Sequence, residues 1–276
     1  MPKALAQYFG GKQEQLDILL PLVQSIKHHT WVEAACGMAS LTLAKEPAAV
    51  EVINDFEDRV VCLFEAVRDH PKWLSAKLSA TPYSRRVFEE CKALAADADE
   101  ERRVRGWAYL TCLRQSFSSA PGEVWGRVVG HSRRKMASSC SRWLPIHDNV
   151  AAVADRLRTV LIERQDAADL IAAFDRPETL FYVDLPYLPL TRKASARNVF
   201  HQEADLDTHK RMLKAAIRAK GKFIISGYAH PLYDKVLTEE RGWERHQKEV
   251  TCRSAVTAKG TVASDKTRTE VVWVRR

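Results

Sequence analysis

Several short apolar segments of the chain each end at a polar side chain. In "HHTWVEAACGMAS" and "AVEVINDFEDRVVCLF", a stretch of strand-forming residues is followed by a pattern with helical spacing. Two such units in succession favour a parallel sheet, and ligands of such sheets bind at the carboxyl ends of the strands. The polar residues at these ends are Glu33, Asp55, Asp166, Asp184 and Ser226. The sequence therefore predicts an α/β fold with a doubly wound, mostly parallel sheet.

The alternation of strands and helices is interrupted after the second unit. Residues 73 to 107 have a helical pattern without a strand, and the glycines of "SFSSAPGEVWGRVVGHSRRK" punctuate an aromatic and β-branched run that predicts a hairpin. Alternation returns with "TVLIER", "LFYVD", "KFIISGY" and "TEVVWV". We therefore expect one domain formed by residues 1–68 and 145–276, and an inserted helical and hairpin domain over residues 69–144.

Positive charge is concentrated in the predicted insert. The chain has a formal net charge of +8. Six Lys or Arg residues and one acidic residue lie between Arg114 and Trp143, which gives +5 (6 minus 1) in this segment alone. Such a basic segment predicts contact with a nucleic acid, and a solvated loop is the alternative. The residues that we expect to contact DNA here are Arg114, Trp125, Arg127, Arg133, Arg134 and Lys135.

Other features of the sequence limit the class of protein. No run of eighteen apolar residues exists, and "MPKALAQYFGGKQEQL" lacks the apolar core of a signal peptide, so we expect a cytoplasmic protein without a membrane segment. The six cysteines have no CxxC spacing and no nearby histidine at zinc-finger spacing, which predicts reduced thiols and no metal site. The adjacent glycines before Lys12, and Gln13 after it, do not fit a phosphate-binding loop of the Walker type.

Small residues and acids at the first strand ends suit a nucleoside. The turn "EAACGMAS" lets a ligand approach the backbone around Gly37, and Asp55 follows roughly twenty residues later, where an acid can bind ribose hydroxyls. Asp166 is a further acceptor at a strand end, suited to an adenine amino group. The alternatives are tight helix packing at the turn and helix caps at the two acids.

Seven segments, in their order along the chain, carry a more specific resemblance. They are "YFGGK", "VEAACGMAS", "VINDFEDRV", "IERQDAADLI", "FYVDLPY", "KFIISGY" and "TEVVWV". Together they resemble the Dam-like family of N6-adenine-specific DNA methyltransferases, over nearly the whole chain. The resemblance implies a class I methyltransferase fold that binds S-adenosyl-L-methionine, an inserted DNA-recognition domain with a hairpin, and double-stranded DNA as partner. It is compatible with a monomer.

The resemblance also implies roles for individual residues. Tyr8 and Lys12 would lie beside the cofactor, with Lys12 near its carboxylate end. Glu33, Ala35 and Gly37 would lie near its methionine part. Asp55 with Phe56 would bind the ribose, and Asp166 with Ala167 the adenine. The catalytic tetrapeptide would be Asp184, Leu185, Pro186 and Tyr187, and Arg192 would lie in a loop that closes on the target strand.

The tetrapeptide has a chemical rationale. The amino group of adenine is a poor nucleophile because its lone pair is delocalised into the ring. Two acceptors on its N–H bonds, the Asp184 carboxylate and the carbonyl of residue 185, favour a pyramidal nitrogen with an available lone pair. Pro186 stiffens the turn, and Tyr187 offers a flat face on which a flipped-out base can stack. This chemistry needs no metal.

The sequence departs from the family pattern at two places. Leu185 stands where the tetrapeptide usually has a second proline, although its main-chain oxygen is unchanged. Ala34, Ala35 and Ala39 replace a proline, an aromatic residue and a second glycine of the first-strand motif. The alternatives to DNA adenine methylation are N-methylation of RNA or of a protein amide, and a catalytically impaired DNA-binding relative.

Overall fold

The computed structural model describes residues 2–6, 8, 10–117, 124–186, 204–251 and 267–276. Its centre is a seven-stranded sheet with the order β5-β2-β1-β6-β7-β9-β8. The strands are β1 (Thr30–Glu33), β2 (Val50–Asn54), β5 (Val160–Glu163), β6 (Thr179–Val183), β7 (Lys222–Tyr228), β8 (Glu244–Thr251) and β9 (Thr267–Arg275). The first five of these pair in parallel, and β9 pairs antiparallel with both β7 and β8. The predicted doubly wound, mostly parallel sheet is confirmed.

Helices cover both faces of the sheet because its central strands are apolar on both sides. Along β6, Leu180 and Tyr182 pack with α1, whereas Phe181 and Val183 pack with α9 and α10. This alternation follows from the period of two in a strand, and the continuous apolar run follows from burial on both faces. The helices outside the insert are α1 (Leu16–Ser25), α2 (Ser40–Ala44), α3 (Asp58–Asp69), α8 (Val150–Leu157), α9 (Ala167–Phe174), α10 (Leu206–Arg218) and α11 (Pro231–Asp234), with 3-10 turns η1 (Lys12–Gln15), η3 (Leu144–Asn149) and η6 (Glu239–Arg241).

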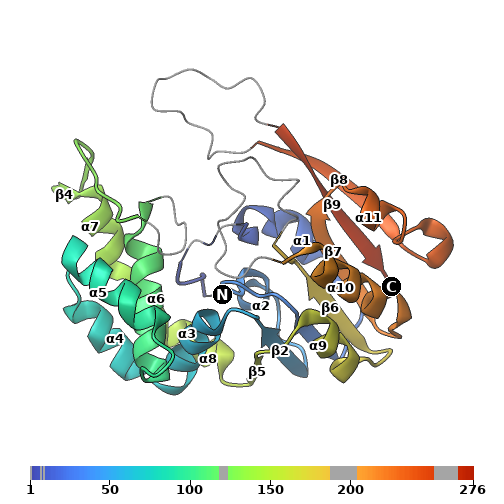
Figure 1. Cartoon of the computed structure of the whole chain (residues 1–276), viewed down its shortest axis with the longest axis horizontal. Helices are drawn as coiled ribbons and strands as arrows, with labels where there is room; N and C mark the ends of the chain where they lie inside the picture. Colours follow the sequence, from blue (N-terminus) through green and yellow to red (C-terminus); the bar gives the residue numbers. More distant parts are fainter. Residues whose placement is uncertain (1, 7, 9, 118–123, 187–203, 252–266) are drawn as a thin grey trace.

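The interruption of the sheet is helical, as predicted. Its elements are α4 (Pro71–Ala80), α5 (Arg85–Ala96), α6 (Arg102–Gln115), β3 (Ser132–Arg133), β4 (Met136–Ala137) and α7 (Ser138–Trp143). Figure 1 shows them gathered on one side of the molecule, beside α3 and α8. The division into domains at residues 69 and 144 stays a prediction.

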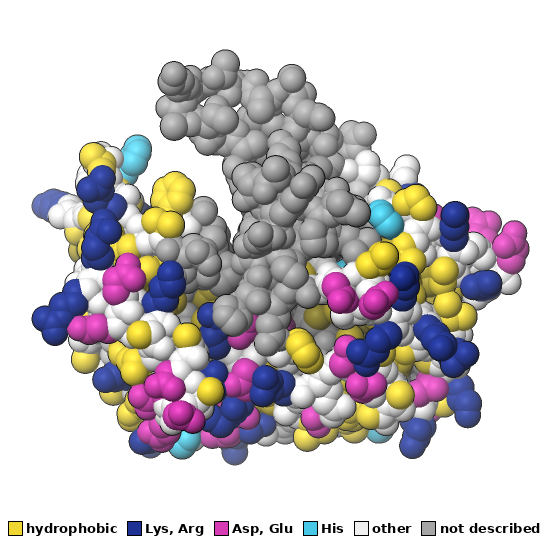
Figure 2. Space-filling model, viewed as in Figure 1, with side chains coloured by type: hydrophobic (Ala, Val, Ile, Leu, Met, Phe, Trp, Pro, Cys, Tyr) yellow, Lys and Arg dark blue, Asp and Glu magenta, His cyan; other side chains and the backbone are white. Residues whose placement is uncertain are grey.

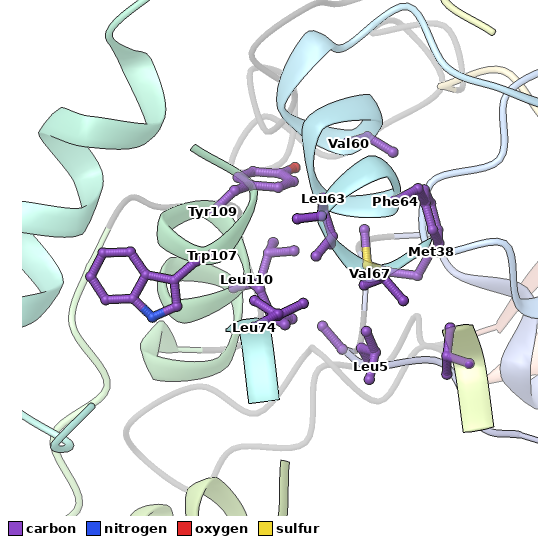
Figure 3. Packing of buried hydrophobic residues seen from close by; sticks show 14 of the residues in the cluster. Leu5, Met38, Val60, Leu63, Phe64, Val67, Leu74, Trp107, Tyr109 and Leu110 are labelled. Atoms are coloured by element: carbon purple, nitrogen blue, oxygen red, sulfur yellow. The ribbon is translucent and has the colours of Figure 1, made fainter. Parts of the chain in front are cut away.

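The inserted helices share an apolar core with α3. Leu63 of α3 lies toward Leu110 of α6 in one buried cluster, to which Phe64 and Trp107 also belong (Figure 3). The two helices cross so closely at Gly106 that an added Cβ would lie 2.8 Å from the carbonyl carbon of Cys62. Only glycine allows this approach, and the close packing ties the insert firmly to the helix that follows β2.

The expected hairpin appears as two separate pairings. Phe117 N donates to Val124 O at 2.8 Å, and Gly126 N donates to Gln115 O at 2.7 Å. A second, very short hairpin is formed by β3 and β4, and Arg134 and Lys135 form its turn with φ of 53° and 59°. The basic residues therefore lie at a hairpin tip and do not simply follow the first pairing.

Candidate active site

The ends of β1 and β6 lie side by side where the order of the sheet reverses. From β1 the chain continues to β2 and β5 on one side, and from β6 it continues to β7 on the other. Glu33 is the last residue of β1, and Asp184 directly follows β6. Ligands of doubly wound sheets bind at this switch point, outside the carboxyl ends of the strands. The candidate active site is built here.

A buried ion pair joins the beginning of the chain to the end of β6. Lys12 Nζ lies 2.7 Å from Asp184 Oδ2 and donates to Gly10 O at 3.0 Å. The Lys12 side chain is 5% exposed and that of Asp184 is 15% exposed. Burial alone would lower the pKa of Lys12, but the attraction of Asp184 holds it well above its usual range. The structure thus places the lysine ammonium directly on the predicted catalytic carboxylate.

Glu33 is bound to the helix that follows the first turn. Its carboxyl accepts a hydrogen bond from Thr42 N at 3.0 Å and another from the Thr42 hydroxyl. Thr42 Oγ1 in turn accepts the indole N–H of Trp31 at 2.8 Å. Burial raises the pKa of Glu33 to about 7, although the bonds from Thr42 oppose this rise. Glu33 therefore anchors α2 beneath the turn.

The turn after β1 needs glycine at position 37. Gly37 has φ of 48°, in the left-handed region, and an added Cβ would lie 2.8 Å from Cδ1 of Tyr8. The Tyr8 ring thus lies against the backbone of the turn. Ala39, where the resembling family has its second glycine, also has φ of 48°. The alanine keeps the backbone conformation that glycine would adopt, at a steric cost that glycine avoids.

Asp55 connects this turn to the end of β2. Its Oδ2 accepts from Gly37 N and its Oδ1 from Glu57 N, both at 2.9 Å. Burial raises the pKa of Asp55 to about 6, while the main-chain N–H bonds oppose the rise. The cap of α3 is Glu57, so Asp55 is not the helix cap that was its alternative role. Phe56 beside it is 58% exposed.

Asp166 does cap a helix. Its Oδ1 accepts from Ala168 N at 2.8 Å at the start of α9 and lies 3.2 Å from Arg211 Nη2. Its neighbour Ala167 is buried. A cap does not prevent further contacts, because a carboxylate has about four acceptor positions.

The predicted DNA-binding residues differ in their exposure. Arg127, Arg133, Arg134 and Lys135 are exposed, and the last three lie in the β3–β4 hairpin of the insert. Figure 2 shows Lys and Arg side chains here, beside hydrophobic ones. Trp125 is half-buried, with Tyr83 at 5.6 Å and the Arg85 guanidinium 5.0 Å from its ring. Arg114 is also half-buried, and its Nη2 donates to Arg142 O at 2.6 Å.

The catalytic tetrapeptide is described as far as Pro186. Leu185 is buried and Pro186 is half-buried. Tyr187 and Arg192 lie outside the described residues. Ala35, half-buried, lies in the turn after β1.

One family model matches residues 8–251, that of the D12 class N6 adenine-specific DNA methyltransferases. The match covers most of the chain, including every strand end described above. The chain belongs to this family. A comparison with curated proteins found no match. The D12 class methyltransferase thus has the activity that the seven segments implied, methylation of adenine in DNA.

No helix among the described residues is long and apolar enough to cross a membrane. In the same part of the chain, no three His, Cys, Asp or Glu side chains are grouped as a metal ion requires. Cys36, Cys62, Cys91, Cys112 and Cys140 are free thiols.

The sequence did not reveal several residues that shape the methyltransferase site. Asn54 Nδ2 donates to Ala34 O at 2.8 Å and to Gln165 O at 3.0 Å, so it ties together the turns after β1, β2 and β5. His209 is buried beside Pro186, and Tyr233 lies next to it. An amide at the end of a buried strand was the signal for Asn54, whereas His209 and Tyr233 follow the tetrapeptide without a recognisable spacing.

Substitution of Glu33 by glutamine should change how stability depends on pH. A carboxyl group whose pKa is raised by folding stabilises the protein below its unfolded pKa, and this contribution is lost as pH rises through the folded value. For Glu33 the window runs from 4.5 to about 7. We therefore expect the free energy of unfolding of Glu33→Gln, relative to the parent protein, to increase from pH 4.5 to pH 8.

Urea unfolding of both proteins across this range measures the difference. Glu178→Gln, at an exposed position on the loop before β6, is the control and should leave the pH dependence unchanged. Parallel stability curves for Glu33→Gln and the parent protein would show that the buried carboxyl does not titrate in this window.

Proposed function

We propose that this methyltransferase transfers the methyl group of S-adenosyl-L-methionine to N6 of an adenine that is flipped out of duplex DNA. We further propose that Asp184, Leu185, Pro186 and Tyr187 form its catalytic turn. The observation that supports this most is the position of Asp184: a carboxylate at the switch point of the sheet, paired with a buried ammonium. A base inside a duplex cannot reach such a recessed group, which supports base flipping.

The residues at the other strand ends fit a nucleoside-bearing cofactor. When bound, S-adenosyl-L-methionine supplies a methyl group on a positively charged sulfur. Because Gly37 has no side chain, the Tyr8 ring packs against the backbone of this turn, and both would lie beside the methionine part of the cofactor. Asp55 holds two N–H groups and retains acceptor positions for ribose hydroxyls. The exposed ring of Phe56 offers an apolar face for the adenine, near the cap of α9 at Asp166 and Ala167.

The catalytic turn would act on the amino group of the target adenine. Asp184 accepts one of its N–H bonds, and the main-chain oxygen of Leu185 accepts the other. This geometry localises the nitrogen lone pair and stabilises the positive charge that develops on nitrogen. Lys12 holds the carboxylate in place and favours its charged form, since an ammonium at 2.7 Å offsets the cost of burial. Leucine can replace proline at position 185 because the acceptor belongs to the main chain.

The basic hairpin tip is the proposed DNA contact. Arg133, Arg134 and Lys135 are exposed there, and Arg127 is exposed on the segment before the hairpin; all four can bind phosphates or base edges. The half-buried Arg114 and Trp125 are held by contacts within the insert, to Arg142 and Arg85 respectively, and are part of the proposed DNA-contacting segment. In this proposal double-stranded DNA is the partner, the cytoplasm is the place of action, and one copy of the chain suffices.

Transfer of labelled methyl groups tests the catalytic assignment. Incubation with methyl-labelled S-adenosyl-L-methionine should label duplex DNA at adenine N6, and Asp184→Ala should lower the rate by about 100-fold or more. Calorimetry should show that this variant still binds the cofactor and DNA. Near-normal turnover of Asp184→Ala would remove Asp184 from catalysis. Labelling of RNA or of peptide amides without labelling of duplex DNA would contradict the proposed substrate.

Removal of the lysine charge should change the pH dependence of the reaction. In Lys12→Met the buried carboxylate lacks its cation and takes up a proton more readily, so transfer at pH 7 should fall roughly tenfold or more and recover as the pH is raised. Lys12→Arg keeps the charge and should preserve the profile of the parent protein. The single-turnover rate of each protein between pH 6 and pH 9 is the measurement. A loss in Lys12→Met that is the same at every pH would contradict the proposed role.

Loss of the hairpin charges should reduce the salt dependence of DNA binding. Each phosphate contact contributes about 0.9 to the slope of log affinity against log salt concentration. Replacing Arg133 and Arg134 by alanine should therefore weaken binding and lower the slope by about 2. The control pair, Arg218 and Lys220, is exposed at the end of α10, and its replacement should leave the slope unchanged. An unaltered slope in the Arg133 and Arg134 variant would exclude both from the interface.

A further inference from the structure

A buried polar chain ends on the catalytic turn. His209 lies in the first turn of α10, which is capped by Asp205. His209 Nε2 is 3.1 Å from the main-chain oxygen of Pro186, and Nδ1 is 2.6 Å from the hydroxyl of Tyr233. His209 is 1% exposed and Tyr233 is 5% exposed. The three groups thus form one connected series inside the protein.

The partners determine which ring nitrogen of His209 carries the proton. A carbonyl oxygen can only accept a hydrogen bond, so Nε2 donates to Pro186 O. Nδ1 is then the acceptor in a neutral ring, and the hydroxyl of Tyr233 donates to it. Burial, with a further contribution from Asp184, raises the pKa of Tyr233 well above its usual range, so its hydroxyl keeps the proton. Each hydrogen bond of the series therefore has a defined donor: Tyr233 donates to His209, and His209 donates to Pro186 O.

Tyr233 is itself held firmly in place. Its ring stacks on Trp273 of β9, with centroids 5.0 Å apart and an interplanar angle of 24°. It belongs to the same apolar cluster as Leu185. The series therefore runs from Tyr233, which packs on the sheet, through His209 to the main-chain carbonyl of Pro186. Pro186 is the residue directly after Leu185.

The turn needs such support because Leu185 is not a proline. A proline fixes φ at about −65°, whereas leucine leaves this angle to be set by its surroundings. The bond from His209 immobilises the carbonyl of Pro186 and so restricts the turn on the carboxyl side of Leu185. Burial of the leucine side chain restricts it further.

We propose that His209 and Tyr233 are positioning residues that brace the catalytic turn and supply the rigidity that a proline at position 185 would give. They touch neither the base nor the cofactor in this proposal. They act by fixing the main chain that presents the Asp184 carboxylate and the Leu185 oxygen. The inference rests on the proposed catalytic role of these two acceptors.

A double-mutant experiment tests this brace. His209→Ala should lower the single-turnover rate of methyl transfer by roughly 10- to 100-fold, because small misplacements of acceptors are costly, with little change in affinity for cofactor and DNA. His209→Gln retains an N–H donor at a similar reach and should recover most of the rate. Tyr233→Phe should cause a smaller loss. Leu185→Pro should restore activity to His209→Ala. The rate of the double variant should therefore exceed the rate expected if the effects of the two single substitutions simply multiplied.

A matched control separates positioning from general stability. Met212→Ala removes a fully buried side chain from the same helix one turn later. It should lower the melting temperature without lowering the single-turnover rate. If it slows transfer as much as His209→Ala does, or if Leu185→Pro gives no rescue, His209 has only a structural role and the proposal is wrong.

Hydrogen exchange of the protein without cofactor or DNA gives an independent reading. The amides of Asp184 and Leu185 should exchange faster in His209→Ala than in the parent protein, and near the parent rate in His209→Gln. If exchange responds in this way while the parent protein methylates no DNA, the brace stands and the proposed function fails. If the parent protein is active and exchange is unchanged in His209→Ala, the brace is wrong.

Discussion

The site depends on the ion pair between Lys12 and Asp184. Three carboxyl groups, those of Glu33, Asp55 and Asp184, lie close together at the ends of β1, β2 and β6, and Lys12 supplies a positive charge among them. Burial works against charge on each of them. Glu33 and Asp55 are held by hydrogen bonds from Thr42 and from the main chain, and their pKa values are raised to about 7 and about 6. Asp184 alone among the three has an ammonium at 2.7 Å in the described part of the chain. The environments of these neighbouring carboxyl groups therefore differ: Glu33 and Asp55 hold the turns by hydrogen bonds, and Asp184 pairs with Lys12.

The strands that carry these groups could be predicted, whereas most of the contacts between them could not. Apolar runs that end on Glu33, Asp55 and Asp184 are visible locally, and their order along the chain predicts parallel pairing. The strand β8 was missed because "ERHQKEVT" is polar, and its described side chains, Glu244 to Gln247, are exposed at the edge of the sheet. The bond from His209 to Pro186 and the pairing of Lys12 with Asp184 join segments that are far apart in sequence. Such contacts depend on where the side chains point in the folded protein, and the spacing of residues in the sequence does not predict them.

The two departures from the family pattern are accommodated in different ways. At Ala39 the backbone keeps the left-handed conformation of a glycine, so the shape of the turn is preserved at a local steric cost. At Leu185 the lost restriction on φ has to be compensated by contacts from elsewhere, and the buried leucine side chain and the carbonyl of Pro186 are where such contacts are found. In both cases the side chain differs from the family pattern but the backbone conformation can be kept. The expected contacts of these segments are made by the main chain, so they can be retained.

The inserted helices are physically continuous with the cofactor end of the proposed site. Tyr109 of α6 lies beside Tyr8, whose ring lies against Gly37, and the Arg59 guanidinium of α3 is 5.0 Å from the Tyr109 ring. Arg102 and Arg105 of α6 also pair with Asp58 at the start of α3, directly after the segment that holds Asp55. Because these contacts lie in or beside one packed core, a shift of α6 must also displace Tyr8 or α3. DNA held at the tip of the insert would therefore be fixed relative to Asp184, and recognition of the sequence and presentation of the base would depend on the same contacts.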